Sequence, residues 1–139
     1  MAEIEGYKMP DDLYYHKEHM WVKKESDVIR IGLTDFSQNL SGELSFIELP
    51  ETESEAEADE VIGSYETGKW MGKIYSPVAG EVVEVNSELE DDPTLINSDP
   101  YGAGWIFTMR PADSAEVDAL MHGEAAIEWL KTEIAKHVK

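Results

Sequence analysis

The amino-acid sequence predicts a mainly β protein: a compact sandwich or barrel of short strands, with a short internal helix and helices near the C-terminus. Three observations lead to this fold class. Six or more short runs of strand-forming residues are separated by turns that contain Gly and Pro. Helical spacing of apolar residues appears only after Pro111, apart from one short stretch that begins at Thr34. The length of 139 residues is one domain's worth of sequence, so we expect a single domain over residues 1–139.

The composition is that of an acidic globular protein. The chain has 11 Lys and Arg residues against 30 Asp and Glu residues, and its formal net charge is -19. Such a surface repels nucleic-acid phosphates and anionic lipid headgroups, so we expect no nucleic acid and no membrane as a partner. The absence of cysteine excludes disulfides and thiolate nucleophiles from the chain itself. The acidic, polar start does not have the pattern of a signal peptide, and we predict a cytoplasmic location.

The first part of the chain predicts three strands and one helix. Residues 1–12 are expected to form an N-terminal arm that ends in a turn. A strand is expected over His16–Val22, and another over Val28–Leu33, where alternate apolar residues form one buried face. Thr34–Leu40 begins with a capping residue and has apolar residues at helical spacing, which predicts a short helix closed by Gly42. Leu44–Leu49 is the third strand, and a proline ends it.

Two polar clusters invite a metal-binding interpretation, and neither fits one. His16 and His19 are three residues apart, which places them on opposite faces of an extended strand. Two histidines are also too few for a closed site. Between Glu51 and Glu60 the acids fall mainly at alternate positions, which predicts an extended segment with a solvent-facing acidic side. This run lacks the glycine and the ligand order of a calcium-binding loop, so we predict no metal site.

The region around Lys69 predicts a β-hairpin that presents one lysine to solvent. Strand-forming residues at Val61–Tyr65 and Lys73–Tyr75 flank a turn at Gly68–Trp70, and Glu81–Val85 supplies a further strand. A lysine at such a tip holds a nucleophilic amine on a flexible stem, clear of the protein body. This arrangement suits a protein that offers one side chain to other proteins, as a swinging-arm carrier does.

The last part of the chain predicts a long connection, one strand and two helices. Asn86–Pro100 is acidic and has no clear period, and Trp105–Met109 follows as a strand. Asp113 and Glu116 have the spacing of a capping box at the start of the first helix. The second helix is expected over Glu124–Lys139. Its apolar face is formed by Ile127, Leu130, Ile134 and Val138.

The glycines around Lys69 also match part of a phosphate-binding loop. In that motif Ser or Thr follows the lysine and binds magnesium, whereas this chain has Trp70. A helix should come next and direct its N-terminal dipole at the phosphates, whereas a strand is predicted here. The sequence therefore argues against nucleotide binding.

Over most of its length the chain resembles the glycine cleavage system H proteins. The alignment runs without a gap from Glu48 to Trp105 and places the lipoyl-bearing lysine of that family on Lys69. The last two of the matching stretches are highly specific in combination. The stretches are His19–Val22, Ile31–Phe36, Glu48–Glu51, Glu66–Lys69, Ile74–Asn86 and Leu95–Trp105.

This resemblance implies a barrel-sandwich hybrid fold of the lipoyl-domain type and a carrier that is not itself an enzyme. Lipoic acid would be joined to Lys69 by an amide bond, and Glu66 would lie near the arm. The amide removes the charge of the lysine and adds an apolar arm with a dithiolane, so the cofactor supplies all thiol chemistry. The expected partners are a lipoate–protein ligase or lipoate-assembly enzymes, and dihydrolipoamide dehydrogenase.

Departures from the family pattern near the arm change the expected cargo. H proteins carry an aminomethyl cation, which the family is understood to shelter against acidic and hydroxyl side chains. In this chain Glu18 adds an acid at the corresponding positions, but Met20 removes one and Lys73 places a cation where the family has an acid. A sulfur cargo suits this environment better, because a nearby cation stabilises a thiolate. Met20 and Trp70 would add polarisable contacts to sulfur.

These features resemble the lipoate-binding proteins of bacterial sulfur oxidation, which serve a heterodisulfide-reductase-like complex. The leading hypothesis from the sequence is therefore a lipoyl carrier, modified at Lys69, that shuttles sulfur to such a complex. One alternative is a glycine cleavage carrier of the aminomethyl group, acting with the glycine cleavage enzymes. Another alternative is a docking module in which Lys69 is never lipoylated. A monomer is the simplest expectation for all of them.

Overall fold

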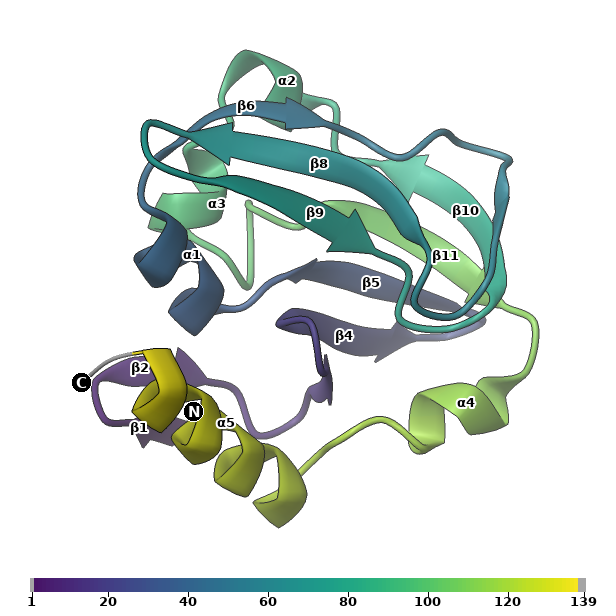
Figure 1. The fold of residues 1–139 in the computed structure, drawn as a ribbon. Helices are drawn as coiled ribbons and strands as arrows, with labels where there is room; N and C mark the ends of the chain where they lie inside the picture. Colours follow the sequence, from purple (N-terminus) through teal and green to yellow (C-terminus); the bar gives the residue numbers. More distant parts are fainter. Residues whose placement is uncertain (1, 138–139) are drawn as a thin grey trace.

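Two antiparallel sheets form the body of the protein in the computed structural model, which describes residues 2–137 (Figure 1). This arrangement, with helices late in the chain, confirms the predicted fold class. The larger sheet contains, in hydrogen-bonded order, β3 (Tyr14–His16), β4 (Met20–Glu25), β5 (Val28–Leu33), β11 (Phe107–Pro111), β10 (Gly80–Val85) and β7 (Glu55–Ala56). The smaller sheet contains β6 (Leu44–Glu48), β8 (Val61–Thr67) and β9 (Met71–Tyr75).

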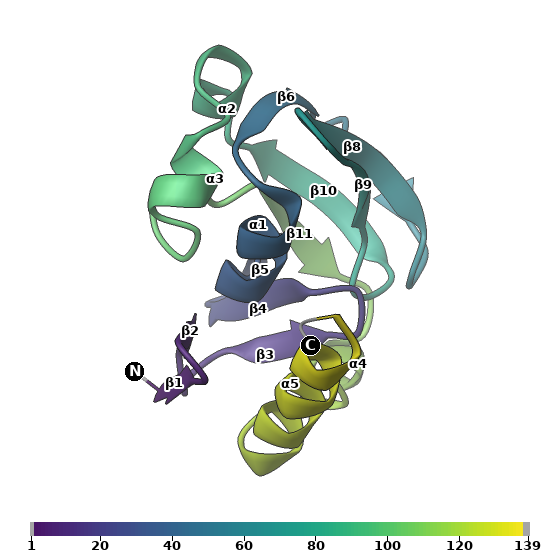
Figure 2. The same ribbon diagram turned by 60° about the vertical axis from the view of Figure 1, so that its left-hand side comes forward.

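A small hairpin and five helices surround these sheets. The hairpin consists of β1 (Ala2–Ile4) and β2 (Tyr7–Met9). The helices are α1 (Asp35–Ser41), α2 (Glu88–Asp91), α3 (Leu95–Ser98), α4 (Ser114–Asp118) and α5 (Glu124–His137). In Figure 2, α5 runs beside β3, and α1 lies beside β4 and β5. Within residues 2–137, no helix is both long enough and apolar enough to cross a membrane.

The buried side chains form two clusters that fix the positions of the sheets and of α5. The first fills the space between the sheets and includes Ile31, Ile74 and Phe107. The second lies under α5, where Leu130 packs in the same cluster as Trp21 and others. Burial of such large apolar side chains contributes roughly 1.5–3 kcal/mol each. The second cluster therefore attaches the C-terminal helix firmly to the β body.

The expected strand at Val28–Leu33 and the helix that follows it are both confirmed. Alternate residues of the strand are buried, as the apolar pattern requires. The side-chain oxygen of Thr34 caps α1 by accepting a hydrogen bond from the backbone N–H of Ser37 at 3.2 Å. Gly42 closes α1 with a φ of 91° and a ψ of -171°, a combination that is open essentially only to glycine. The short internal helix thus begins and ends where the sequence predicts.

The prediction of one continuous strand over His16–Val22 is wrong. The chain reverses between β3 and β4, which pair with each other, and His19 takes a φ of 68° in this turn. Non-glycine residues rarely adopt a positive φ, so the strand propensity of this segment does not predict the turn. His16 and His19 bond to different carboxylates, of Asp59 and Glu133 respectively. Among residues 2–137 no cluster of His, Cys, Asp and Glu could hold a metal ion.

Two further segments differ from the prediction. Residues 1–12 were expected to be an arm, but β1 and β2 pair through a turn in which Glu5 and Gly6 both have positive φ. Two positive φ values in succession match the twist of a tight hairpin. The acidic run from Glu51 to Glu60 is mostly turns, with Glu55–Ala56 as its strand, and its acids are exposed as predicted.

The C-terminal part contains more helix than the sequence predicts. The connection Asn86–Pro100 includes α2 and α3, each only four residues long, which is too short to show a helical period. The strand expected over Trp105–Met109 is displaced to Phe107–Pro111. Asp113 caps α4 as predicted. The carboxylate of Glu116 instead accepts a hydrogen bond from Ala79 N, so Glu116 does not complete the predicted capping box.

The last helix lies where the sequence predicts it. In α5, Leu130 and Ile134 of the predicted apolar face are buried, and Ile127 is half-buried. The predicted face also included Val138, which lies with Lys139 outside the described residues.

Candidate functional site

Lys69 lies at the exposed turn between β8 and β9. Backbone pairing continues to the end of the hairpin, where Thr67 N donates to Trp70 O at 2.8 Å. The hydroxyl of Thr67 accepts a hydrogen bond from the backbone N–H of Lys69 at 3.3 Å. Gly68 is not in the left-handed region, and a Cβ added there would meet nothing within 4 Å. The predicted hairpin tip is therefore confirmed, and its short turn is ordered by hydrogen bonds.

The stem of Lys69 extends from the tip over the C-terminal end of α1. Its Cε lies 3.2 Å from the point that a Cβ on Gly42 would occupy, and its Nζ lies 3.9 Å from that point. A side chain at position 42 would therefore crowd the lysine stem. Among residues 2–137 the ammonium group of Lys69 has no ion pair or hydrogen bond. The amine is thus exposed and unpaired within the described chain.

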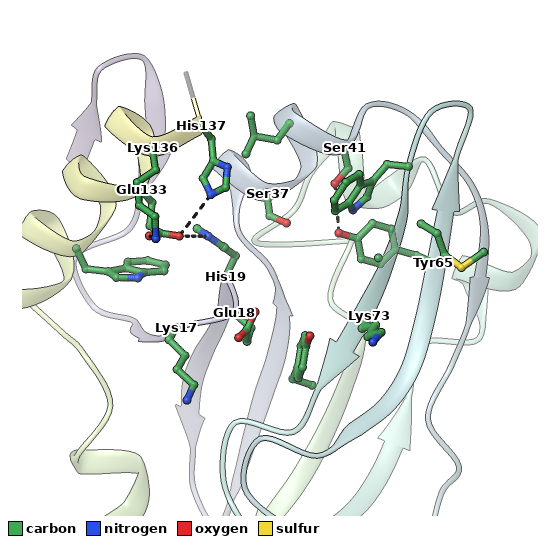
Figure 3. Close-up of a pocket in the computed structure, with 16 residues that line it drawn as sticks. Lys17, Glu18, His19, Ser37, Ser41, Tyr65, Lys73, Glu133, Lys136 and His137 are labelled. Carbon is green, nitrogen blue, oxygen red and sulfur yellow. Dashed lines mark hydrogen bonds and ion pairs between the residues drawn. The ribbon is translucent and has the colours of Figure 1, made fainter. Parts of the chain in front are cut away.

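A groove of about 780 Å³ begins beside this tip. Figure 3 shows Glu133, Lys136 and His137 on one side, Tyr65 and Lys73 on the other, and Ser37 and Ser41 between them. The hairpin wall comes from β8 and β9, the helix wall comes from α5, and α1 and the β3–β4 turn complete the site. The lining residues are Lys17, Glu18, His19, Ser37, Leu40, Ser41, Tyr65, Trp70, Met71, Gly72, Lys73, Tyr75, Trp129, Glu133, Lys136 and His137.

Close packing fixes the hairpin wall against α1. The hydroxyl groups of Tyr65 and Ser41 are 3.2 Å apart and share a hydrogen bond. Gly72 is the register partner of Tyr65, and a Cβ on Gly72 would come within 2.1 Å of the tyrosine ring. The missing side chain at position 72 therefore lets the ring lie flat across β9. This contact holds the base of the hairpin tip in one position relative to α1.

Asn97, in the helix α3, holds the other side of the same junction. Its amide nitrogen donates to Gln38 Oε1 and to Gly42 O, both at 2.9 Å. Its side-chain oxygen accepts a hydrogen bond from Leu44 N at 2.9 Å. One side chain thus joins the end of α1 to the start of β6, directly below the lysine stem. The end of α1 is consequently a rigid platform for Lys69.

The helix wall is fixed by a partly buried histidine–carboxylate pair. His19 Nε2 lies 2.8 Å from Glu133 Oε1, and the ring of His19 packs 4.9 Å from that of Trp129. Glu133 also bonds to Lys136 at 3.3 Å and lies 3.9 Å from His137 Nε2. The oxygens of Glu133 are therefore already engaged by the groove's own basic groups.

The surroundings of this pair shift the pKa of both partners. Burial lowers the pKa of His19, although the hydrogen bond to Glu133 opposes this shift. Burial raises the pKa of Glu133, but the contacts with His19 and Lys136 outweigh it and hold that pKa below its ordinary value. A neutral His19 therefore donates from Nε2 to an ionised Glu133. His19 Nδ1 is left buried without a hydrogen-bond partner among the described residues.

Two exposed charges in the groove remain available to a bound group. Lys17 pairs with Asp59 at 3.5 Å outside the groove, and Lys136 pairs with Glu133. Glu18 and Lys73 are exposed and form no ion pair among residues 2–137. The groove can therefore offer one free carboxylate and one free ammonium to whatever enters it.

The structure brings three of the predicted neighbours of the arm together and separates two from them. Glu18, Trp70 and Lys73 line the groove. Glu66 is exposed on β8 and is not a lining residue. Met20 is 0% exposed and packs in the core between the sheets, so its side chain is not available for the predicted contact with sulfur.

Sequence reasoning missed the whole helix wall. Trp129, Glu133, Lys136 and His137 line the groove, as does His19 from the β3–β4 turn. The four helical positions have the spacing of one helix face, which was a usable signal. The apolar face of the same helix, with Leu130 and Ile134, gives a stronger periodic signal and masks this one. Tyr65, on the opposite side of the groove, could not be recognised from the sequence as a site residue, because tyrosines are common in strands.

The β body thus holds Lys69 exposed at a hairpin tip beside a groove, an arrangement that suits a carrier protein, which offers one side chain to other proteins. A model of the family described as "Glycine cleavage H-protein" matches residues 13–133 of this chain. The chain therefore belongs to the glycine cleavage H-protein family of lipoyl carriers, as the sequence motifs implied.

Individual relatives agree with this assignment. The chain is 45% identical to the glycine cleavage system H protein of Halalkalibacterium halodurans over 125 residues. This matched segment covers 90% of this chain and 98% of that protein. The chain is 46% identical over 125 residues to glycine cleavage system H protein 1 of Caldanaerobacter subterraneus, with 90% and 99% covered. The crystal structure of a glycine cleavage system H protein from Mycobacterium marinum matches with a TM-score of 0.78 at 30% identity, covering 90% of this chain and 98% of that one.

Several of the matched motif residues build the fold outside the groove. Trp21 Nε1 donates to Pro100 O at 2.9 Å, and the Tyr101 hydroxyl donates to Lys8 O at 2.8 Å. Asn86 Nδ2 donates to two carbonyls of the loop before β11, at 2.9 and 2.8 Å. These motifs therefore identify the family through its architecture, and they do not by themselves define the cargo.

Proposed function

We propose that Lys69 carries lipoate through an amide bond and that this chain is a noncatalytic carrier whose arm rests in the groove between the hairpin wall and α5. The observation that carries this proposal is the position of the Lys69 amine, exposed, unpaired within residues 2–137 and directed over Gly42 beside the groove. The bound cofactor would supply a dithiolane whose sulfurs accept and release the carried group.

The residues around the groove fit an apolar arm with a reactive end. Trp70, Met71, Leu40 and Trp129 provide apolar surface along the lining, which suits an aliphatic chain. The shared hydrogen bond between Tyr65 and Ser41 keeps this lining in place. The chain's own residues would therefore position the arm and shield its end from water, without taking part in bond making.

The cargo that we propose is the aminomethyl group of glycine cleavage. The names of relatives at about 45% identity over most of this chain support this cargo. Glu18 also supports it, because this exposed carboxylate lines the groove and has no ion pair among the described residues. A cationic amine at the end of the arm would find its counter-charge there. The partners would then be the glycine cleavage enzymes and dihydrolipoamide dehydrogenase.

Sulfur is the second candidate cargo, and Lys73 favours it. The ammonium group of Lys73 lines the groove without an ion pair among residues 2–137. It would stabilise a thiolate or an anionic sulfur adduct and would repel a cationic amine. The partner would be a heterodisulfide-reductase-like complex. Met20 lends no support here because it is buried, so this hypothesis depends on Lys73 and Trp70.

The two cargoes make opposite predictions for one substitution. Lys73→Asp removes the cation and adds a second carboxylate to the groove, so it should improve retention of an aminomethyl group and weaken retention of anionic sulfur. The assay is glycine decarboxylation reconstituted with the lipoylated chain and the other glycine cleavage enzymes. Lys131→Asp is the matched control, because Lys131 is exposed on α5 and does not line the groove.

Turnover of glycine by the wild type, raised by Lys73→Asp and unchanged by Lys131→Asp, is the outcome that the glycine cleavage proposal predicts. A lipoylated chain that turns over no glycine, with or without the substitution, would overturn this cargo. A chain from its native cell that carries no lipoate would instead favour the unlipoylated docking module.

A further inference from the structure

The outer face of the smaller sheet carries a row of exposed side chains next to Lys69. Phe46 on β6, Glu66 on β8 and Met71 on β9 are register partners, so they lie side by side across the three strands. Phe46 is 53% exposed and Met71 is 68% exposed. Trp70, in the turn next to Met71, is 57% exposed. We refer to Phe46, Glu66, Trp70 and Met71 as the tip face.

Acidic residues border the tip face. Two hollows of about 750 Å³ and 570 Å³ adjoin it and share Glu48 and Glu51. Phe46 lines the first hollow, and Met71 lines the second. The basic residue among the lining residues is Lys73. The acids that line the two hollows are Glu48, Glu51, Glu55, Glu60 and Glu90.

An apolar centre with an acidic border is complemented by a surface with an apolar centre and a basic border. Large apolar side chains at the centre of an interface supply most of its affinity, and border charges guide the approach of the partner. The net charge of -19 over the whole chain adds to this attraction at long range. The tip face therefore fits a protein whose contact surface is basic and partly apolar.

The position of the tip face selects one partner among those that act on the arm. An enzyme that works on the far end of a flexible arm can do so with its body at a distance from Lys69. The enzyme that forms the amide must instead bring its catalytic centre to within bonding distance of Nζ. Because Lys69 stands between Trp70 and Thr67 at the turn, that enzyme has to cover the residues beside it.

The geometry points to the tip face as the docking surface for the enzyme that acylates Lys69, an acyltransferase with a basic, partly apolar rim around its active site. This inference rests on the proposed function, since it requires Lys69 to be lipoylated. In the reaction the neutral Lys69 amine attacks the acyl carbon of a lipoyl donor activated as a phosphate anhydride or a thioester. The N–C bond forms, the bond from carbon to the phosphate oxygen or to sulfur breaks, and the nitrogen loses one proton.

Kinetics of lipoylation test this inference. The unmodified chain is incubated with a lipoate–protein ligase, lipoate and ATP, and initial rates are taken from intact mass. Combined Phe46→Ser and Met71→Ser substitutions should raise the KM for the chain about tenfold or more, which corresponds to roughly 1.4 kcal/mol of lost binding, with little change in kcat. The KM of the wild type should also rise with salt concentration.

Val61→Ser is the matched control. Val61 is 47% exposed, belongs to the β8–β9 hairpin and lines the second hollow, but it is not part of the tip face and lies at the opposite end of β8 from Lys69. This variant should keep the wild-type KM, and circular dichroism should show that all variants are folded.

Competition separates docking from chemistry. A Lys69→Gln chain cannot be acylated but keeps the tip face, so it should inhibit lipoylation of the wild type. Adding the Phe46→Ser and Met71→Ser substitutions to this competitor should remove the inhibition. A tip-face variant with an unchanged KM, or a Val61→Ser control that is equally impaired, would overturn the docking inference alone. A wild-type chain that accepts no lipoyl group would overturn the proposed function as well.

Discussion

The two walls of the groove beside Lys69 are held by different forces. On the hairpin side, Trp70 and Met71 are exposed, and the Lys69 ammonium has no ion pair among residues 2–137. On the helix side, Leu130 is buried in the second core cluster, and Glu133 bonds to His19 of the β3–β4 turn. The hairpin wall therefore offers side chains to other molecules, whereas the helix wall contributes to the stability of the fold. Substitutions that compare the walls should separate function from stability.

The largest effect is expected from a truncation in the helix wall. Leu130→Ala leaves a cavity under α5 and should lower the free energy of unfolding by about 2–5 kcal/mol. Trp70→Ala removes an exposed ring and should change it by less than about 0.5 kcal/mol. Urea unfolding followed by circular dichroism measures both values. Equal losses for the two variants would show that the hairpin tip is packed in solution and that the contrast between the walls is wrong.

A pair of glycines gives an intermediate effect within the hairpin itself. Gly72→Ala drives a methyl group into the ring of Tyr65 and should cost about 1–3 kcal/mol of stability. Gly68→Ala meets nothing within 4 Å at an ordinary backbone conformation, so it should be neutral or stabilise by up to about 1 kcal/mol. Thermal unfolding of the two variants is the measurement. A destabilising Gly68→Ala would mean that the turn needs the freedom of glycine.

The smallest effect is the pH dependence that the helix wall confers. The pKa of His19 is lowered in the folded chain, so the unfolded chain, with a pKa near 6.5, binds protons more readily. The contribution of His19 to the free energy of unfolding is therefore fully present above about pH 6.5, and it is lost as the pH falls from there through the lowered pKa of the folded chain. The pKa of Glu133 is also lowered, so its contribution to the free energy of unfolding is likewise lost as the pH falls below about 4.5.

A variant of His19 isolates this contribution. His19→Asn keeps a residue type that tolerates the left-handed conformation at this turn, and it removes the titrating ring. The variant should lose less thermal stability than the wild type between pH 7.5 and 5, whatever its stability at neutral pH. His122→Asn, at an exposed histidine that lies outside the groove, is the control and should follow the wild type. Identical slopes for wild type and His19→Asn would contradict the assignment of a neutral His19.

The sequence allowed the fold and the hairpin tip to be predicted because their signals are local. Alternation over Val28–Leu33 and the caps of α1 depend on neighbouring residues only. The turn at His19 could not be predicted, because its left-handed backbone is held by a pair with Glu133, which is 114 positions away in the sequence. The short helices α2 and α3 were missed for a related reason. Their shape is set by packing of Leu89 and Ile96 into the core and not by periodicity.

The same contrast between local signals and long-range packing applies to the candidate site. Lys69, Trp70 and Lys73 are close in the sequence and were found through one motif. Met20 was selected by its alignment position alone, and burial in the core excludes the role that was expected for it. Alignment assigns a position to a column, but only the packed structure shows whether the side chain faces the groove.

Lipoylation of Lys69 is tested most simply by the mass of the chain purified from its native cell, with peptide mapping across the β8–β9 hairpin. We predict a single lipoyl increment on the peptide that contains Lys69, and no increment on any other lysine or in a Lys69→Ala chain. An unmodified Lys69 in cells that lipoylate their other carrier proteins would show that this chain is not a lipoyl carrier.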